Sequence, residues 1–379
     1  MKSILKVRRM TIDSVRAVRD TWTMLRGIHY RLLRRRRKGS LFNVRRIMVI
    51  NQQALGDATL SLPALRDLAD WKASGAGREV FFVVRPEYEQ WIQTRVPDVR
   101  VLSVHPQRTH STDTALLFKS REPDMLIDMD TTRNTSNLKL AKKLKVSVII
   151  GNDCGGKGSW PDVTVAFGSL KAPLPHISER YRNMVKAITL HAGAPHAPGT
   201  HGCKPCVYPL KIGIHPGSSL NGVSRRWPVQ RFAELINKIS GQWECQIHLF
   251  GGYAEKSEID KLLDIMGGKI HGTCINQSLV VFAAGLAEMD LLLCNNSGPM
   301  HVAAELNVST ISINGPTARN FYPVKKGNDH LALHADLPCI GCNDTNSCEI
   351  RIACLKNYTS EDAWTKIKPF MERFTINRR

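Results

Sequence analysis

Two residues near the start of the chain combine a flexible backbone with a side chain that could take a proton. Gly56 and Asp57 follow the apolar run at 47–50, at a strand-to-helix turn of the kind where open α/β sheets bind ligands. Glycine lets backbone approach a ligand, and a carboxylate aimed into a crevice can act as a general base. The alternative interpretation of Asp57 is a helix N-cap. Both interpretations place Asp57 at the amino end of a helix, where amide dipoles favour the ionised carboxylate.

A second loop has the composition of a phosphate site. Small residues that include Ser218 and Ser219 follow the β-rich run at 211–215, and the pair Arg225 and Arg226 comes shortly afterwards. Glycine and serine permit close backbone approach and donate hydrogen bonds, while arginines add forked cationic donors. The pattern predicts a diphosphate cradle formed by Ser218, Ser219 and Arg225. An ordinary polar loop with solvated arginines is the alternative.

Two further strand-to-helix junctions present glycine and polar side chains. The first, after the run at 246–250, could hold a ribose or a base edge. The second, after the run at 291–294, offers side chains and amides at a helix start, which suit a phosphate or a sugar hydroxyl. The single histidine of this junction is more typical of a packed or capping residue than of a catalyst. The residues concerned are Gly252, Glu255, Asn296, Ser297, Gly298 and His301.

Four cysteines lie close together near the carboxyl end, in the pattern Cys339-x2-Cys342-x5-Cys348-x5-Cys354. Thiolates at such spacings can enclose tetrahedral Zn or Fe. We expect a structural metal here, with reduced and unliganded thiols as the alternative.

An Asp-x-Asp sequence also occurs, at Asp128 and Asp130. It resembles the metal-binding motif of other enzymes, but it ends an apolar run far from the predicted phosphate loops. A structural or acceptor-binding role is therefore favoured.

The elements that must position these residues follow a regular order. After residue 45, β-rich runs alternate with helical segments, and a stretch rich in Pro, Gly and His at 191–209 divides them into two series. Such alternation is typical of parallel sheets with helices on both faces. The sequence predicts an α/β fold with two Rossmann-like domains facing across a cleft. Expected strands are 47–50, 80–84, 125–129, 146–150, 211–215, 246–250, 291–294 and 310–313; expected helices include 229–239, 254–266, 278–286 and 299–306.

Positive charge is concentrated before these elements. The chain has a formal net charge of +20, and residues 1–46 hold 15 Lys and Arg against two Asp, a net +13. Val15, Val18, Trp22, Leu25 and Leu32 lie along one face of a predicted helix in this arm. A localised basic arm indicates an anionic partner, either phospholipid or nucleic acid. The alternative is that the helix packs on the first domain or on a partner subunit.

The predicted domain order is a basic amphipathic arm at 1–44, one Rossmann-like domain at 45–200, a second with the cysteine cluster at 201–360, and a helix at 361–379. The amphipathic segment 360–374 is expected to pack back on the first domain. No apolar run approaches the roughly 20 residues that span a bilayer, and the amino end lacks the features of a secretory signal. These observations favour a cytoplasmic protein.

Four stretches of the sequence are similar to glycosyltransferase family 9, the lipopolysaccharide heptosyltransferases. They are IMVINQQALGDATLSLPALRDL, IGIHPGSSLNGVSRRWPVQRFAELI, LFGGYAEKSEI and LAEMDLLLCNNSGPMHVAAELNVSTISINGPT. The resemblance covers about residues 45–365 in order, which makes chance similarity improbable. It implies a GT-B fold, an ADP-heptose donor bound by the second domain, an acceptor sugar bound by the first, and anomeric inversion without a catalytic metal.

The resemblance also assigns roles to individual residues. Asp57 becomes the general base and Arg225 the phosphate-pairing cation, while Asn296 stands where the family has an acid and so removes a negative charge near the donor sugar. We place Gly56, Arg133 and Asn134 in acceptor binding. The implied partners are ADP-heptose, a lipopolysaccharide core acceptor and, through residues 1–44, the anionic inner face of the bacterial cytoplasmic membrane.

Two other functions remain open at this point. One is a heptosyltransferase that modifies proteins, such as autotransporters. The other is a non-catalytic nucleic-acid-binding protein, which is disfavoured because the basic arm lacks a known recognition module.

Overall fold

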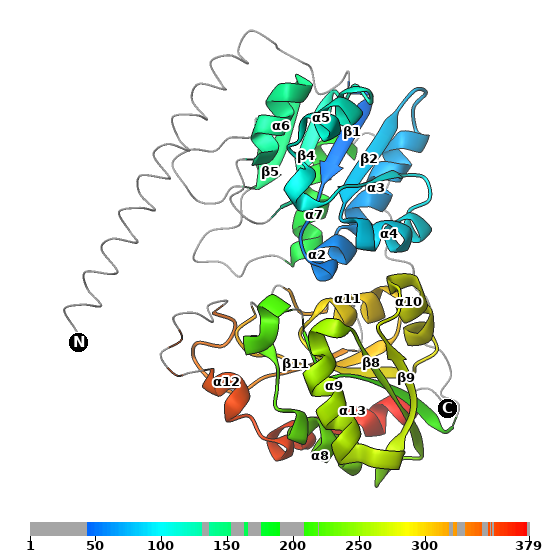
Figure 1. Cartoon of the computed structure of the whole chain (residues 1–379), viewed down its shortest axis with the longest axis vertical. Helices are drawn as coiled ribbons and strands as arrows, with labels where there is room; N and C mark the ends of the chain where they lie inside the picture. The colour runs from blue at the N-terminus through cyan, green and yellow to red at the C-terminus, as the bar shows by residue number, and fades with distance from the viewer. Residues whose placement is uncertain are drawn as a thin grey trace, which may run out of the picture. The chain divides into compact units, whose positions relative to one another are not determined.

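The computed structural model describes residues 44–130, 136–152, 163–165, 176–189, 208–218, 220–317, 321–323, 330–342, 348, 350 and 352–376. The predicted basic arm and most of the predicted linker at 191–209 lie outside these residues. By its internal contacts the chain divides into two compact units, Met1–Gln53 with Ser61–His196, and Ala54–Leu60 with Ala197–Arg379 (Figure 1).

The first unit is built on a parallel six-stranded sheet in the order β3-β2-β1-β4-β5-β6. Its central strands are apolar along most of their length because helices cover both faces of a parallel sheet. The strands are β1 (Arg46–Ile50), β2 (Glu79–Val84), β3 (Arg100–Ser103), β4 (Met125–Asp128), β5 (Val148–Asn152) and β6 (Val163–Val165). The helices are α3 (Leu62–Ala73), α4 (Glu89–Arg95), α5 (Thr112–Lys119), α6 (Ser136–Leu144) and α7 (Ile177–Thr189), with short 3-10 turns η2 (Pro86–Tyr88) and η3 (Pro106–Arg108).

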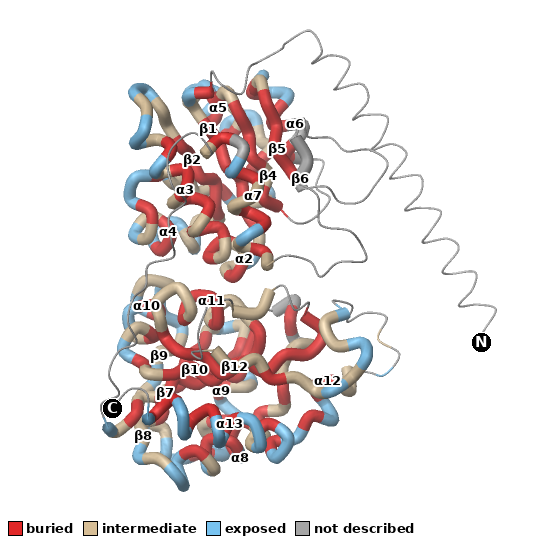
Figure 2. The backbone as a smooth tube through the Cα atoms, turned by 180° about the vertical axis from the view of Figure 1, so that it is seen from behind, coloured by how far each residue is buried: buried red, intermediate tan, exposed pale blue. Residues whose placement is uncertain are grey.

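The second unit has a sheet of the same kind, in the order β12-β11-β10-β7-β8-β9. Figure 2 shows the central strands of both sheets as largely buried. The strands of the second unit are β7 (Leu210–His215), β8 (Cys245–Gly251), β9 (Ile270–Ile275), β10 (Leu291–Asn295), β11 (Ser309–Ile313) and β12 (His330–Leu333). Its helices are α2 (Leu55–Leu60), α8 (Val229–Ser240), α9 (Lys256–Met266), α10 (Leu279–Ala287), α11 (Gly298–Glu305), α12 (Ala353–Lys356) and α13 (Ser360–Ile376), with 3-10 turns η4 (Leu220–Arg225), η5 (Tyr253–Glu255) and η6 (Gly267–Lys269).

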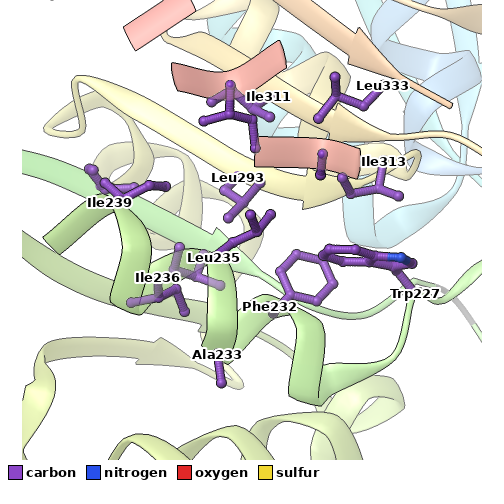
Figure 3. Packing of buried hydrophobic residues seen from close by; sticks show 14 of the residues in the cluster. Trp227, Phe232, Ala233, Leu235, Ile236, Ile239, Leu293, Ile311, Ile313 and Leu333 are labelled. Atoms are coloured by element: carbon purple, nitrogen blue, oxygen red, sulfur yellow. The ribbon is translucent and has the colours of Figure 1, made fainter. Parts of the chain in front are cut away.

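The core of the second unit forms between α8 and the sheet. Apolar residues recur along α8 at helical spacing, so one face of the helix packs on the strands while the opposite face is polar. Figure 3 shows Trp227 and Phe232 beside Leu293, Ile313 and neighbouring strand residues. The two aromatic rings meet edge to face, with centroids 5.3 Å apart.

The observed elements confirm the predicted α/β class and correct several details. Each predicted strand overlaps an observed one, but β3, β6, β9 and β12 were not expected. The helix expected after Asp57 is two helices, α2 and α3, separated at Ser61, with a proline in the first turn of α3. No described helix has the length and apolar character needed to cross a membrane.

The expectation that the last helix packs on the first domain is wrong. Ala363, Ile367, Phe370, Met371 and Phe374 of α13 belong to the hydrophobic core of the second unit. Their spacing forms one apolar stripe, which is covered by α8 and β12.

Candidate functional site

The loops predicted to bind a ligand lie along one edge of the second sheet. From β7 the chain winds outward to β9 and then returns to β10 on the other side of β7. In open α/β sheets the ligand crevice lies at the carboxyl ends of the strands where the winding changes direction. Ser218 follows β7, Asn296 follows β10, and Gly252 and Glu255 follow β8. The structure therefore brings these loops together at the expected crevice.

The two neighbouring arginines have different surroundings. Arg226 donates from Nη2 to the carbonyl oxygens of Ser218 (2.6 Å) and Ala254 (2.7 Å), and its Nη1 pairs with Glu258 at 2.6 Å. The expectation of a phosphate-binding role is wrong for Arg226, because its guanidinium is occupied inside the protein. Arg225 is half-buried and makes no hydrogen bond or ion pair within the described part of the chain. Arg225 is therefore the arginine available to a ligand.

Asn295, which was not predicted, holds the β7 loop in place. The side chain is fully buried at the end of β10. Its Oδ1 accepts a hydrogen bond from the Trp227 amide (3.0 Å), and its Nδ2 donates to the carbonyl oxygens of Pro216 (2.7 Å) and Gly217 (3.3 Å). The one signal in the sequence is an amide side chain that ends an otherwise apolar strand.

The loops after β7 and β8 touch at a glycine. A Cβ on Gly217 would lie 1.8 Å from Glu255 Cγ, so only glycine fits here. Glu255 Oε2 accepts from the Gly252 amide at 2.9 Å. Burial raises the pKa of Glu255, against the lowering effects of this hydrogen bond and of Arg226. Burial is the larger cause, and the charge of Arg226 the smaller one, of a lowering of the pKa of His215 to about 4. Its imidazole is therefore neutral at physiological pH.

Of the two serines of the predicted cradle, Ser218 lies in the described part of the chain. Ser218 is buried, and its hydroxyl donates to the Gly222 carbonyl at 2.6 Å. Its side chain is thus used within the loop, which leaves backbone amides as the loop's donors to a ligand. Ser219, Arg133 and Asn134 lie outside the described residues.

The helix that carries Asp57 packs within the second unit. Helix α2 contacts α11, and two glycines allow the close approach. A Cβ on Gly56 would lie 2.8 Å from His301 Cδ2, and one on Gly298 would lie 3.0 Å from Leu55 Cβ. Asp57 is the third residue of α2, inside its first turn, so it does not occupy the N-cap position. His301 is a buried, packed residue, and the structure places it beside Gly56.

Much of the second unit matches the sequence profile of a known family. The sequence profile of glycosyltransferase family 9 (heptosyltransferase) matches residues 179–352, which include the loops after β7, β8 and β10. Residues 179–352 are therefore similar to the glycosyltransferases of family 9.

Curated relatives match over part of their length. The chain is 29% identical over 162 residues to lipooligosaccharide heptosyltransferase 2 of Campylobacter jejuni. The matched residues make up 41% of this chain and 50% of the relative. It is 30% identical over 120 residues to lipopolysaccharide heptosyltransferase 2 of Escherichia coli K12. Here the matched residues make up 30% of this chain and 33% of the relative. The matched stretch therefore spans half or less of these relatives.

Solved structures extend the likeness to both units. The structure of E. coli heptosyltransferase WaaC with ADP has a TM-score of 0.62 at 19% identity, covering 87% of this chain and 99% of that one. A family 9 glycosyltransferase from Veillonella parvula has a TM-score of 0.68 at 18% identity, covering 87% and 98%. At such identities the likeness shows the fold, which is the predicted GT-B class.

The stretch that matches the family 9 profile includes three of the four cysteines predicted to bind metal. Cys339 and Cys342 are exposed, Cys348 is half-buried, and Cys354, just beyond the domain, is buried. The pKa of Cys354 is raised mainly by burial and, to a smaller extent, by the other three thiols nearby. Yet no group of three or more His, Cys, Asp or Glu side chains among the described residues is arranged to hold a metal ion. The thiols lie in one region, but their arrangement does not support the predicted Zn or Fe site.

Outside the stretch that matches family 9, the Asp-x-Asp sequence has structural contacts in the first unit. Asn137 Nδ2 bridges Asp128 Oδ1 (2.9 Å) and Asp130 Oδ2 (3.2 Å), and Asp130 Oδ1 accepts from the Gln52 amide at 3.1 Å. Burial and the neighbouring Asp130 raise the pKa of Asp128. These contacts fix the end of β1 to the end of β4, in keeping with the structural role, which is one of the two roles that the sequence favoured.

Proposed function

We propose that the chain is an inverting glycosyltransferase that moves a heptose from ADP-heptose to a core sugar of lipopolysaccharide. The observation that supports this most is the position of the family 9 match, which covers the edge of the sheet where the loops after β7, β8 and β10 meet. Two curated relatives of the chain are heptosyltransferases by name.

Donor binding rests on the second unit in this proposal. The diphosphate lies against the Gly217–Ser218 amides, and Arg225 supplies the balancing charge. Asn295 and Arg226 do not touch the ligand but hold the loop whose amides do. Because these donors are fixed before the ligand arrives, they stabilise the charge on the departing ADP without rearrangement. Transfer therefore needs no catalytic metal in this proposal.

Asp57 carries out the proton transfer. Its carboxylate takes the proton of the acceptor sugar's hydroxyl as that oxygen attacks the anomeric carbon of the heptose. The bond between the anomeric carbon and the diphosphate oxygen breaks with its electron pair going to ADP, and the configuration inverts. Asp57 ends protonated and returns its proton to solvent.

A transfer assay tests the proposal. The purified full-length chain is given a panel of sugar nucleotides and a truncated lipopolysaccharide core, with a peptide acceptor in a parallel arm. We expect turnover with ADP-heptose and the core, an inverted product by NMR, and unchanged rates in EDTA. Turnover with none of the donors, or a product of retained configuration, contradicts the proposal; transfer to the peptide alone redirects it to protein modification.

The proposed site of action is the inner face of the cytoplasmic membrane. The basis is the charge of the arm at 1–44, because its lysines and arginines would be attracted to anionic lipid beside a lipid-linked acceptor.

A further inference from the structure

Asn314, directly after β11, has an amide whose orientation is fixed by its neighbours. The residue is fully buried, and its Nδ2 lies 2.9 Å from the carbonyl oxygen of Ser312, 3.0 Å from Ser312 Oγ and 3.2 Å from the carbonyl oxygen of Leu333. Carbonyl oxygens only accept hydrogen bonds. The atom that faces two of them must therefore be the nitrogen, which settles which way the amide points.

This orientation determines what position 296 must provide. Asn314 Oδ1 lies 2.6 Å from Asn296 Nδ2, and since an amide oxygen only accepts, the partner at 296 has to donate. Asn296 is 6% exposed and is held further by its own amide, which donates to the Ile313 carbonyl at 3.0 Å. Its Oδ1 has no hydrogen-bond partner within the described part of the chain. The nitrogen of Asn296 is thus turned to the protein, and its oxygen is left for a ligand.

We infer that Asn314 is a positioning residue that makes position 296 an uncharged hydrogen-bond acceptor for a hydroxyl of the donor sugar. The inference rests on the proposed function, which places a nucleotide sugar at this edge of the sheet. A phosphate oxygen cannot donate to Asn296 Oδ1, whereas a sugar hydroxyl can.

The same pair explains the departure from the family pattern at position 296. A carboxylate there would place an oxygen where the nitrogen now lies, 2.6 Å from Asn314 Oδ1, so two acceptors would face each other without a proton. Asn296 is therefore the residue that Asn314 requires, and the two positions act as one unit.

A double-mutant cycle of thermal stability tests the pair itself. We expect Asn296→Asp to lower the melting temperature in the parent but to cost little in the Asn314→Ser variant, since a serine hydroxyl can donate to a carboxylate. Asn237→Asp is the matched control, because Asn237 is exposed and its Oδ1 already accepts from Lys269 Nζ at 2.7 Å. An equal cost of Asn296→Asp in both backgrounds overturns the inference. If Asn314→Ser does not fold, Asn296→Asp must be less stable than Asn296→Ala in the parent.

Calorimetry with ADP and with ADP-heptose tests what the pair recognises. We expect Asn296→Ala and Asn314→Ser to keep ADP affinity within about twofold and to weaken ADP-heptose about tenfold, the effect of losing one hydrogen bond to the sugar. An equal loss for ADP, or no loss for either ligand, overturns the sugar assignment. If the parent binds neither ligand, the proposed function fails and the sugar assignment with it, while the stability cycle still decides whether the amide pair exists.

Discussion

Asp57 is the residue on which the proposed chemistry depends most. It is partly exposed in the first turn of α2, so Asn can replace it without loss of packing. We expect Asp57→Asn to lower turnover by about 100-fold or more, the usual effect of removing a general base, with unchanged melting temperature and ADP affinity. Asp113→Asn is the control, because Asp113 also lies in the first turn of a helix and is exposed. Parent-like turnover in Asp57→Asn would remove this residue from the mechanism.

Arg225 and Arg226 are adjacent in sequence but should respond differently to replacement. Arg225→Ala removes a charge-assisted contact to diphosphate and should weaken ADP binding by about tenfold or more at unchanged stability. Arg226→Ala breaks the buried pair with Glu258 and should cost about 3–5 kcal/mol of unfolding free energy. Calorimetry and thermal melts measure both effects. Equal ADP affinity in Arg225→Ala and the parent would count against the cradle.

Residue types along the sequence indicate some roles and not others. Gly56 and Arg225 stand out because glycine and an arginine beside small residues are local signals, and their roles in acceptor binding and phosphate pairing stay predictions. The roles of Arg226, Asn295 and Asn314 could not be predicted in the same way. Each depends on partners contributed by another strand or loop, and the identity of those partners is set by the register of the sheet.

At the scale of elements, the contact between the loops after β7 and β8 should be needed for both stability and ADP binding. Gly217→Ala places a methyl group on Glu255 and must displace it from the Gly252 amide. We expect a loss of about 1–3 kcal/mol in unfolding free energy, as for other overpacked sites, together with weaker ADP binding. Gly268→Ala is the control, because a Cβ there meets nothing within 4 Å. Similar stability and ADP affinity for the two variants would show that the loops are not tightly coupled.

The elements that the sequence predicted are the ones with continuous apolar runs. The four strands that were missed, β3, β6, β9 and β12, are the edge strands of the two sheets. Edge strands are short or partly exposed, so their composition mixes polar and apolar residues and the pattern becomes weak. The placement of α13 failed for another reason: an apolar stripe predicts that a helix is buried, but it does not say against which sheet.

At the scale of the whole molecule, the basic arm predicts a salt-dependent location. Its apolar stripe is modest, so charge must supply much of the attraction to a bilayer. We expect the full-length protein to sediment with anionic vesicles at low salt and to be released at high salt, where charges are screened. A chain that starts at Arg45 should stay in solution and still use a water-soluble acceptor analogue. Equal vesicle binding of the shortened chain, or its unfolding, would show that the arm packs on the protein instead.

The two sheets share one winding order, since β3-β2-β1-β4-β5-β6 and β9-β8-β7-β10-β11-β12 place corresponding strands at corresponding positions. Repeated winding of this kind is what duplication and fusion of one ancestral gene segment would leave behind. Each half also has a buried polar link at the ends of its central strands. In the first, Asp130 accepts from the Gln52 amide and so joins the ends of β1 and β4; in the second, Asn295 joins the end of β10 to the loop after β7 through the Pro216 and Gly217 carbonyls. Because each half holds its own strand ends together, directed evolution can vary the loops of one half while the other is left as it is.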